Sequence, residues 1–182
     1  MSAFEFVFSL FGLLLGLSLV EVLAGLVRTV KARKAVRLGW LTPLLGIFVM
    51  LHLTSFWGTA WRLRDHIPAT NAALFTGVIL AGLYYFAASM VFPERPEEWS
   101  DLDEHYFQNK RQVFLGILSC EAIISFISEV LVPTAGTRDF LLGFLFMLVC
   151  FAIPVLVKGK RLNLIVLGLL ISLYIFSALR GA

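Results

Sequence analysis

The sequence has little charge and little cysteine for its 182 residues. Only 15% of the residues are charged, and the two cysteines, Cys120 and Cys150, both lie inside apolar runs. Such isolated cysteines usually pack as small apolar residues, so we expect neither a disulfide nor a zinc site. The sequence also lacks a nucleophile elbow, a phosphate loop, an HExxH motif and paired cysteines. We therefore expect no cofactor and find no catalytic motif.

What the chain has instead is apolar character. Hydrophobic residues make up 59% of it and the mean hydropathy is +0.90, whereas soluble domains usually have about 45–50% apolar residues. We expect a single-domain integral membrane protein, and the net charge of +3 does not indicate nucleic-acid binding. The N-terminal "MSAFEFVF" has no basic region and no cleavage site follows it, so it predicts a first span and no removable signal peptide. If the chain is bacterial, we expect it in the inner membrane.

The apolar residues form six runs, separated by charged segments and by helix breakers. A helix needs about 20 apolar residues to cross the hydrocarbon core. In lipid, backbone amides must pair within their own segment, which favours helices. We therefore predict an all-α integral membrane protein with six transmembrane helices, over residues 4–27, 41–61, 72–92, 113–132, 140–157 and 162–179.

Basic residues predict the orientation of these helices. Eleven of the fifteen Lys and Arg residues lie in the first, third and fifth connections, and Lys and Arg are retained on the cytoplasmic side. Both termini are therefore expected outside. In the third connection, "SDLD" predicts Ser100 as an N-cap with Asp103 three residues later. No breaker follows before Val132, so we predict a cytoplasmic helical extension over residues 100–112 that continues into the fourth span.

Three short stretches in the first half resemble stretches in the second half. "LGLSLVE" resembles "LGILSCE" in spacing, "LLGIFVML" matches "LLGFLFML" at five positions, and "LYYFAA" matches "LYIFSA" at four. The order of the matches favours two three-helix repeats of inverted topology, an arrangement common in transporters. The alternative is chance similarity, because apolar spans draw on few residue types.

Three ionisable residues, Glu21, His52 and Glu121, lie within the apolar runs. A charged carboxylate near the bilayer centre costs about 2.5–3.5 kcal/mol on insertion scales. Helical spacing places further polar side chains on the same faces, which predicts a shared polar interior. Packing by hydrogen bonds between helices is the alternative, and we favour it for His52 considered alone. The predicted transport path consists of Glu21, His52, Glu121, Ser125 and Ser55.

Two further groups are weaker candidates. Arg28 lies two turns beyond Glu21, so these residues can form an ion pair, and Glu129 lies near the outer end of its span. We consider Arg28 and Glu129 as gating or ion-pair residues. Asp101 and His105 have the spacing of divalent-cation ligands on a helix, but acidic residues in a first helical turn explain this pattern as well. We therefore expect no metal site.

These features favour a small multi-pass transport protein, either a channel or a carrier, that moves a proton, a cation or a small solute. We expect it to form homo-oligomers in the bilayer. The alternative is a non-transporting scaffold or accessory subunit that binds a partner through polar helix faces and the acidic cytoplasmic helix. A lipid-modifying enzyme is the least favoured class, because no nucleophile or metal site accompanies the acids and the histidine.

Overall fold

The computed structural model describes residues 3–68, 70–133 and 136–180 and is all-helical within these ranges. Six of its helices are long and apolar enough to cross a membrane, which confirms the predicted fold class. Each coincides with one predicted span. The helices are α1 (Ala3–Lys31), α2 (Leu41–Arg62), α3 (Asn71–Ser89), α4 (Leu102–Leu131), α5 (Thr137–Leu156) and α6 (Lys160–Arg180), with a short 3-10 helix, η1 (Pro96–Glu98), before α4.

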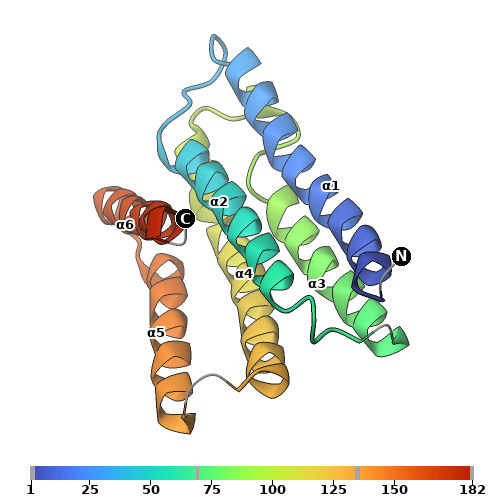
Figure 1. Ribbon diagram of the computed structural model, residues 1–182. Helices are drawn as coiled ribbons and strands as arrows, with labels where there is room; N and C mark the ends of the chain where they lie inside the picture. Colours follow the sequence, from blue (N-terminus) through green and yellow to red (C-terminus); the bar gives the residue numbers. More distant parts are fainter. Residues whose placement is uncertain (1–2, 69, 134–135, 181–182) are drawn as a thin grey trace.

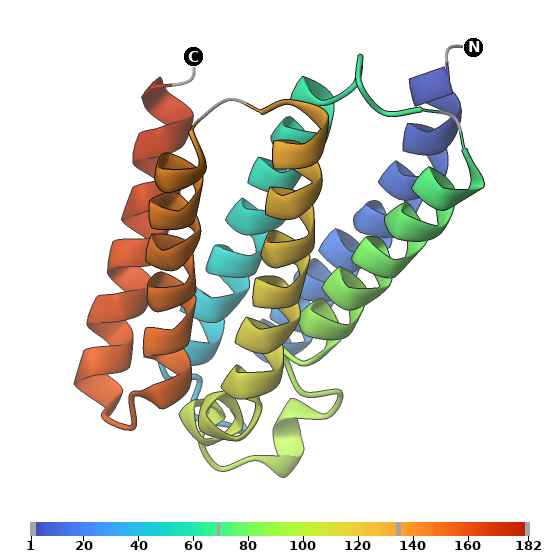
Figure 2. The ribbon, with the colours of Figure 1, turned by 90° about the horizontal axis from the view of Figure 1, so that it is seen from below.

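The helices run between two ends of one bundle (Figures 1 and 2). The pair α1–α3 lies on one side and the pair α5–α6 on the other, with α2 and α4 between them. The described parts of the second and fourth connections, residues 63–68, 132–133 and 136, lie at the same end as the start of α1 and the end of α6, which we call the termini end. The connections 32–40, 90–101 and 157–159 lie at the opposite, basic end. Both termini therefore lie at one end of the bundle.

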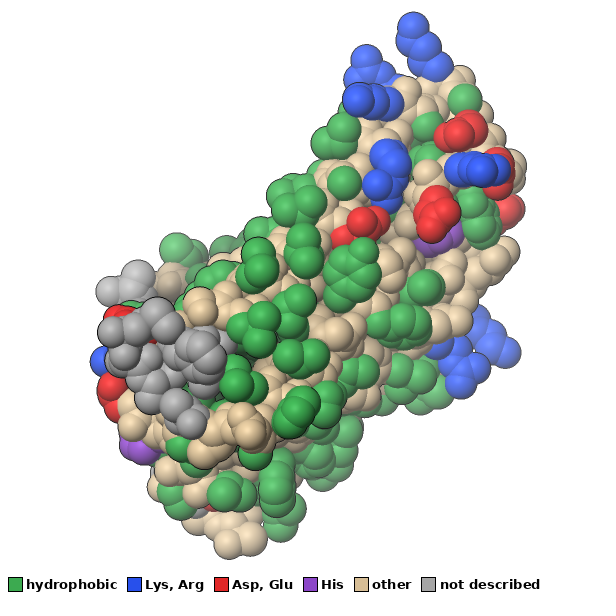
Figure 3. All heavy atoms as spheres, turned by 90° about the vertical axis from the view of Figure 1, so that its right-hand side faces the viewer, with side chains coloured by type: hydrophobic (Ala, Val, Ile, Leu, Met, Phe, Trp, Pro, Cys, Tyr) green, Lys and Arg blue, Asp and Glu red, His purple; other side chains and the backbone are tan. Residues whose placement is uncertain are grey.

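The outer surface between these ends is apolar. Figure 3 shows charged side chains gathered towards the ends of one face, with hydrophobic side chains across the band between them. Leu13 on α1, Phe75 on α3 and Leu145 on α5 are each more than half exposed. A continuous apolar surface of this extent is unfavourable in water. The molecule is therefore a multi-pass integral membrane protein whose exposed side chains suit contact with lipid.

The basic end is held together by the first turns of α4. Asp103 is buried, and its Oδ1 accepts hydrogen bonds from the amides of Trp40 (3.1 Å) and Leu41 (2.9 Å) at the start of α2. Its Oδ2 forms an ion pair with Lys160 at the start of α6. Thr42 also donates to the Leu102 carbonyl at 2.6 Å. The start of α4 thus fixes the starts of two other helices.

One sequence prediction about this segment is wrong. The N-cap of α4 is Asp101, whose carboxylate accepts from the Asp103 amide at 2.9 Å, and it is not Ser100. The reason is that Asp101 pairs with Arg37 as a short β-bridge, which leaves Asp101 itself in extended backbone as the last residue before the helix. The helix of the predicted extension is continuous with the fourth span, and its first turns pack against the starts of α2 and α6.

The first three helices are joined by one phenylalanine. Phe92, just after α3, is buried against Gly25 of α1 and Gly46 of α2. A Cβ atom on Gly25 would lie 2.6 Å from the Phe92 Cβ, and one on Gly46 would lie 2.8 Å from its ring. Both glycines are therefore needed where they are, because any larger residue would collide with this ring.

The helix packing gives no support to the predicted inverted repeat. An exchange of the two halves would match α1 with α4, α2 with α5 and α3 with α6. Within the described residues, α2 packs closely on α6, but α5 and α3 do not pack on each other. The α1–α3 packing is the most extensive in the molecule, whereas α4 and α6 meet chiefly through long side chains. The two halves are therefore packed differently.

Candidate functional site

The interior of the bundle is centred on His52, in the middle of α2. This residue is fully buried. Its Nδ1 lies 3.1 Å from the Tyr84 hydroxyl of α3, and its Nε2 lies 3.2 Å from Glu121 Oε1 of α4. The ring of Tyr174 from α6 lies 5.4 Å from the imidazole, measured between ring centroids. The structure thus brings two of the three predicted interior ionisable groups together, and it adds two tyrosines.

A polar cavity extends from Glu121 towards the termini end. It lies between α2, α4 and α5 and has a volume of about 360 Å³. Its polar wall consists of Glu121, Ser125, Ser128, Glu129, Thr59 and Asp139. Asp139, in the first turn of α5, is exposed, and Glu129 is in the last turns of α4. The cavity therefore joins the termini end to the buried His52–Glu121 pair.

Aromatic side chains close the interior on the other side of His52. Phe48 is fully buried one turn from His52, and its ring centroid lies 5.5 Å from that of Phe114, 6.0 Å from Phe151 and 5.9 Å from Tyr174. We call these four residues the aromatic plug. Phe114 and Phe151 are also buried. The plug separates the polar cavity from the basic end by tightly packed apolar surface.

A second polar cluster lies beyond the plug at the basic end. Asn163 of α6 is fully buried and accepts from the Tyr106 hydroxyl at 2.7 Å and from Lys110 at 3.3 Å. Lys110, also buried, donates to the Val157 carbonyl at the end of α5. From Lys110 to Glu121 is eleven residues, or about 16 Å along α4 at 1.5 Å per residue. The two polar clusters are thus separate, with the aromatic plug between them.

Glu21 lies apart from His52 and Glu121. Its Oε1 pairs with Arg28 at 2.9 Å, and both side chains are about one-third exposed. This is the ion pair that the spacing on the first helix made possible. No residue of α1 lines the described wall of the polar cavity. The structure therefore places Glu21 on a different face of the bundle from the other two groups.

The remaining candidates lie in varied surroundings. Ser55 is exposed and does not line the cavity, whereas Ser125 and Glu129 do. Asp101 caps α4 and lies 3.9 Å from the Arg37 Nε, and the buried His105 packs edge-on against Trp99 at 4.9 Å between centroids. The described residues contain no group of three or more His, Cys, Asp or Glu residues that could hold a metal ion.

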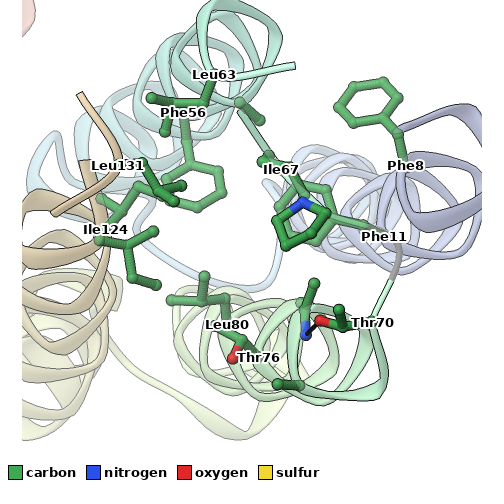
Figure 4. Close-up of a pocket in the computed structure, with 16 residues that line it drawn as sticks. Phe8, Phe11, Phe56, Leu63, Ile67, Thr70, Thr76, Leu80, Ile124 and Leu131 are labelled. Carbon is green, nitrogen blue, oxygen red and sulfur yellow. Dashed lines mark hydrogen bonds between the residues drawn. The ribbon is translucent and has the colours of Figure 1, made fainter. Parts of the chain in front are cut away.

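A separate apolar cavity of about 260 Å³ lies between α1, α2, α3 and α4 near the termini end. Figure 4 shows Phe56, Leu80 and Ile124 around it, with Phe8 and Phe11 from α1. The polar residues labelled in Figure 4 are Thr70 and Thr76. Thr70 is the N-cap of α3, and its hydroxyl oxygen accepts a hydrogen bond from the Ala73 amide. The lining offers no charged group and suits only hydrocarbon.

Several site residues were missed by the sequence reasoning. Tyr84 and Tyr174 occupy matching positions in "LYYFAA" and "LYIFSA", so a signal for them was present in the same comparison that suggested the repeat. Asp139 stands at the start of a span, where an acid is ordinary. Asn163 is a lone amide near a basic connection, and nothing in the sequence alone indicates that it is buried. Comparisons with protein-family models, with curated proteins and with solved structures found no match for this chain.

Proposed function

We propose that the protein is a small membrane transport protein that takes up a proton, a cation or a small solute at the termini end and passes it to the His52–Glu121 pair. The observation that carries the proposal is the polar cavity of about 360 Å³ that ends at Glu121. Ionisable groups inside a membrane are costly and are usually retained for function. Serine and threonine would hold helices together at lower cost, so packing alone does not account for a buried imidazole paired with a carboxylate.

Proton transfer along this chain of groups is supported by the short distances between them. When the imidazole donates from Nδ1–H to the Tyr84 hydroxyl oxygen, its Nε2 is unprotonated and faces Glu121 3.2 Å away. Glu121 in turn lines the cavity. A proton that reaches Glu121 from the cavity therefore has a neighbouring acceptor further inside, without crossing apolar surface.

The aromatic plug supports a carrier more than an open channel. Four rings, three of them buried, fill the space between the polar cavity and the polar cluster of Lys110 and Asn163. In the proposed cycle these rings separate to open the basic end, and the polar cavity closes in exchange. The residues of the plug come from α2, α4, α5 and α6, so its opening requires α5 and α6 to move against α2 and α4.

Flux measurements on proteoliposomes test this function. We expect purified protein to dissipate an imposed proton or cation gradient faster than empty liposomes do. Glu121→Gln and His52→Ala should each lower the rate at least tenfold. Glu21→Gln is the matched control and should retain flux. It also neutralises a carboxylate within a span, but that span, α1, contributes no residue to the described cavity wall. Liposomes as tight as empty ones to protons, sodium, potassium and choline would refute the proposal.

A scaffold or accessory subunit is the second candidate. The observation that favours it is the connection 90–101, where Glu94, Glu97 and Glu98 are all exposed at the basic end. The acids of the α4 start itself are less available, because Asp103 is buried. Two results together would establish this alternative. The liposomes would be electrically silent, and a partner would co-purify at fixed stoichiometry and be lost when these three glutamates are neutralised. Homo-oligomer formation through the exposed faces of α5 and α6 is compatible with either function.

A further inference from the structure

The polar cavity is acidic and has an aromatic side. Three carboxylates line it, Glu121, Glu129 and Asp139, and its described wall contains no Lys, Arg or His. Arg62 lies outside this wall and donates a hydrogen bond to the lining Thr59 at 3.0 Å. Phe140 and Phe144 form the α5 side, with ring centroids 6.0 Å apart and planes inclined by 24°. Negative charge beside aromatic faces is the combination that attracts organic cations.

We propose that this cavity binds a small organic cation with an ammonium group, either a protonated amine or a quaternary amine. The inference rests on the proposed function and names its substrate class. The ammonium group would lie between Glu121 and the ring of Phe144, and the apolar part of the molecule would contact Phe140 and Met147 of α5. The serine and threonine hydroxyls of α2 and α4 would accept hydrogen bonds from a protonated amine.

The size of the cavity favours an organic molecule over a bare proton path. A water molecule takes about 30 Å³ of liquid volume, so a single file of waters needs far less than the 360 Å³ present. Binding cavities for small molecules usually measure about 300–1,000 Å³. The volume thus matches a compact ligand at the lower end of this range.

The spacing of the carboxylates disfavours a metal ion. Glu121 and Glu129 are eight residues apart on α4, which separates their Cα atoms by about 12 Å. A metal ion draws its oxygen ligands to about 2.0–2.6 Å, and no group of three suitable ligands exists among the described residues. Carboxylates spread along a cavity are better suited to attracting an organic cation as it enters than to coordinating a metal ion.

His52 lies directly behind Glu121, at the inner end of the cavity, and has an unsatisfied nitrogen there. Its Nε2 is buried and, although it lies near Glu121, it has no well-formed hydrogen bond among the described residues. A buried polar atom left in this state costs free energy. A protonated amine beside Glu121 would supply the hydrogen-bond donor that Nε2 lacks, while Nδ1–H donates to Tyr84.

Binding of choline tests the inference. We expect the purified protein in detergent to bind choline saturably in calorimetry, whereas 3,3-dimethylbutan-1-ol, which has the same shape without the charge, should bind at least tenfold more weakly. Glu129→Gln and Phe144→Leu should each weaken choline binding, the latter by about tenfold, or about 1.4 kcal/mol, which is within the range of cation–π contacts. Glu21→Gln, the control away from the cavity, should bind choline as the wild type does.

The outcomes separate this inference from the proposed function. Proton flux without choline binding would overturn the organic-cation inference and leave transport intact. Choline binding in a protein whose liposomes are silent would support the inference and contradict transport. Equal affinity for choline and its neutral analogue would show that charge plays no part and would overturn the inference. Displacement of choline by sodium at equal concentration would overturn it as well, because the site would then select small inorganic cations.

Discussion

Removal of the Asp103 carboxylate should destabilise the protein measurably, because this side chain serves as the N-cap of another helix. Trp40, at the N-cap position of α2, makes no capping hydrogen bond with its own side chain. The amides of Trp40 and Leu41 instead donate to Asp103 Oδ1 at 3.1 and 2.9 Å. Hydrogen bonds to a charged group contribute about 1.5–3 kcal/mol each, and an unsatisfied buried donor costs about 1–3 kcal/mol.

The ion pair with Lys160 adds less, because the Lys160 side chain is 44% exposed. Such pairs contribute about 0–1 kcal/mol, and the ammonium can return to water. We therefore expect Asp103→Ala to lower the free energy of unfolding by about 3 kcal/mol. Asp103→Asn keeps an oxygen for both amides and loses the charge, so it should cost about 1 kcal/mol.

The assay is equilibrium unfolding in detergent micelles, followed by circular dichroism, with Glu104→Ala as the control. Glu104 is exposed one residue along the same helix turn, so its removal should change stability by less than about 0.5 kcal/mol. The capping argument is wrong if Asp103→Ala unfolds like the wild type. It is also wrong if Asp103→Asn costs as much as Asp103→Ala, because the charge and not the amide contacts would then dominate.

Two other substitutions probe the bundle. Gly25→Ala should lower the free energy of unfolding by about 1–3 kcal/mol, because its Cβ would meet Phe92. Gly16→Ala on the same helix has open space and should be neutral or slightly stabilising; equal losses in the same unfolding assay would refute the packing argument. Tyr84→Phe removes the hydroxyl beside the buried imidazole and should cost about 1–3 kcal/mol and reduce proton flux. Tyr85→Phe, which is exposed, should do neither.

The fold was largely predictable because lipid leaves few choices. Six apolar runs of sufficient length can only become helices in a bilayer, so their existence and order follow from hydropathy. Helix ends were less predictable. Asp101 and Ser100 are both good N-caps. The choice between them is made by Arg37, some sixty residues earlier, whose backbone pairs with Asp101 and holds it extended.

The candidate site was predictable in part. Stripes of polar residues at helical spacing indicated that His52 and Glu121 face a common interior, and the structure places them 3.2 Å apart. The same reasoning grouped Glu21 with them. A stripe of polar residues shows which side chains share one face of a helix, but it does not show which other helix packs against that face. The face of α1 is turned towards α3 and α2, so Glu21 pairs along its own helix with Arg28. Partners on different helices require tertiary packing to be known.

The position of Phe92 has a consequence for biosynthesis. The ring fits between Gly25 and Gly46, yet it follows the third helix in the chain. During insertion the space between Gly25 and Gly46 of the first two helices therefore stays unfilled until residue 92 has left the ribosome. A nascent chain arrested a few residues before that point should leave α1 and α2 free to slide and to be reached by proteases or crosslinkers, whereas one extended past it should hold three helices as a unit.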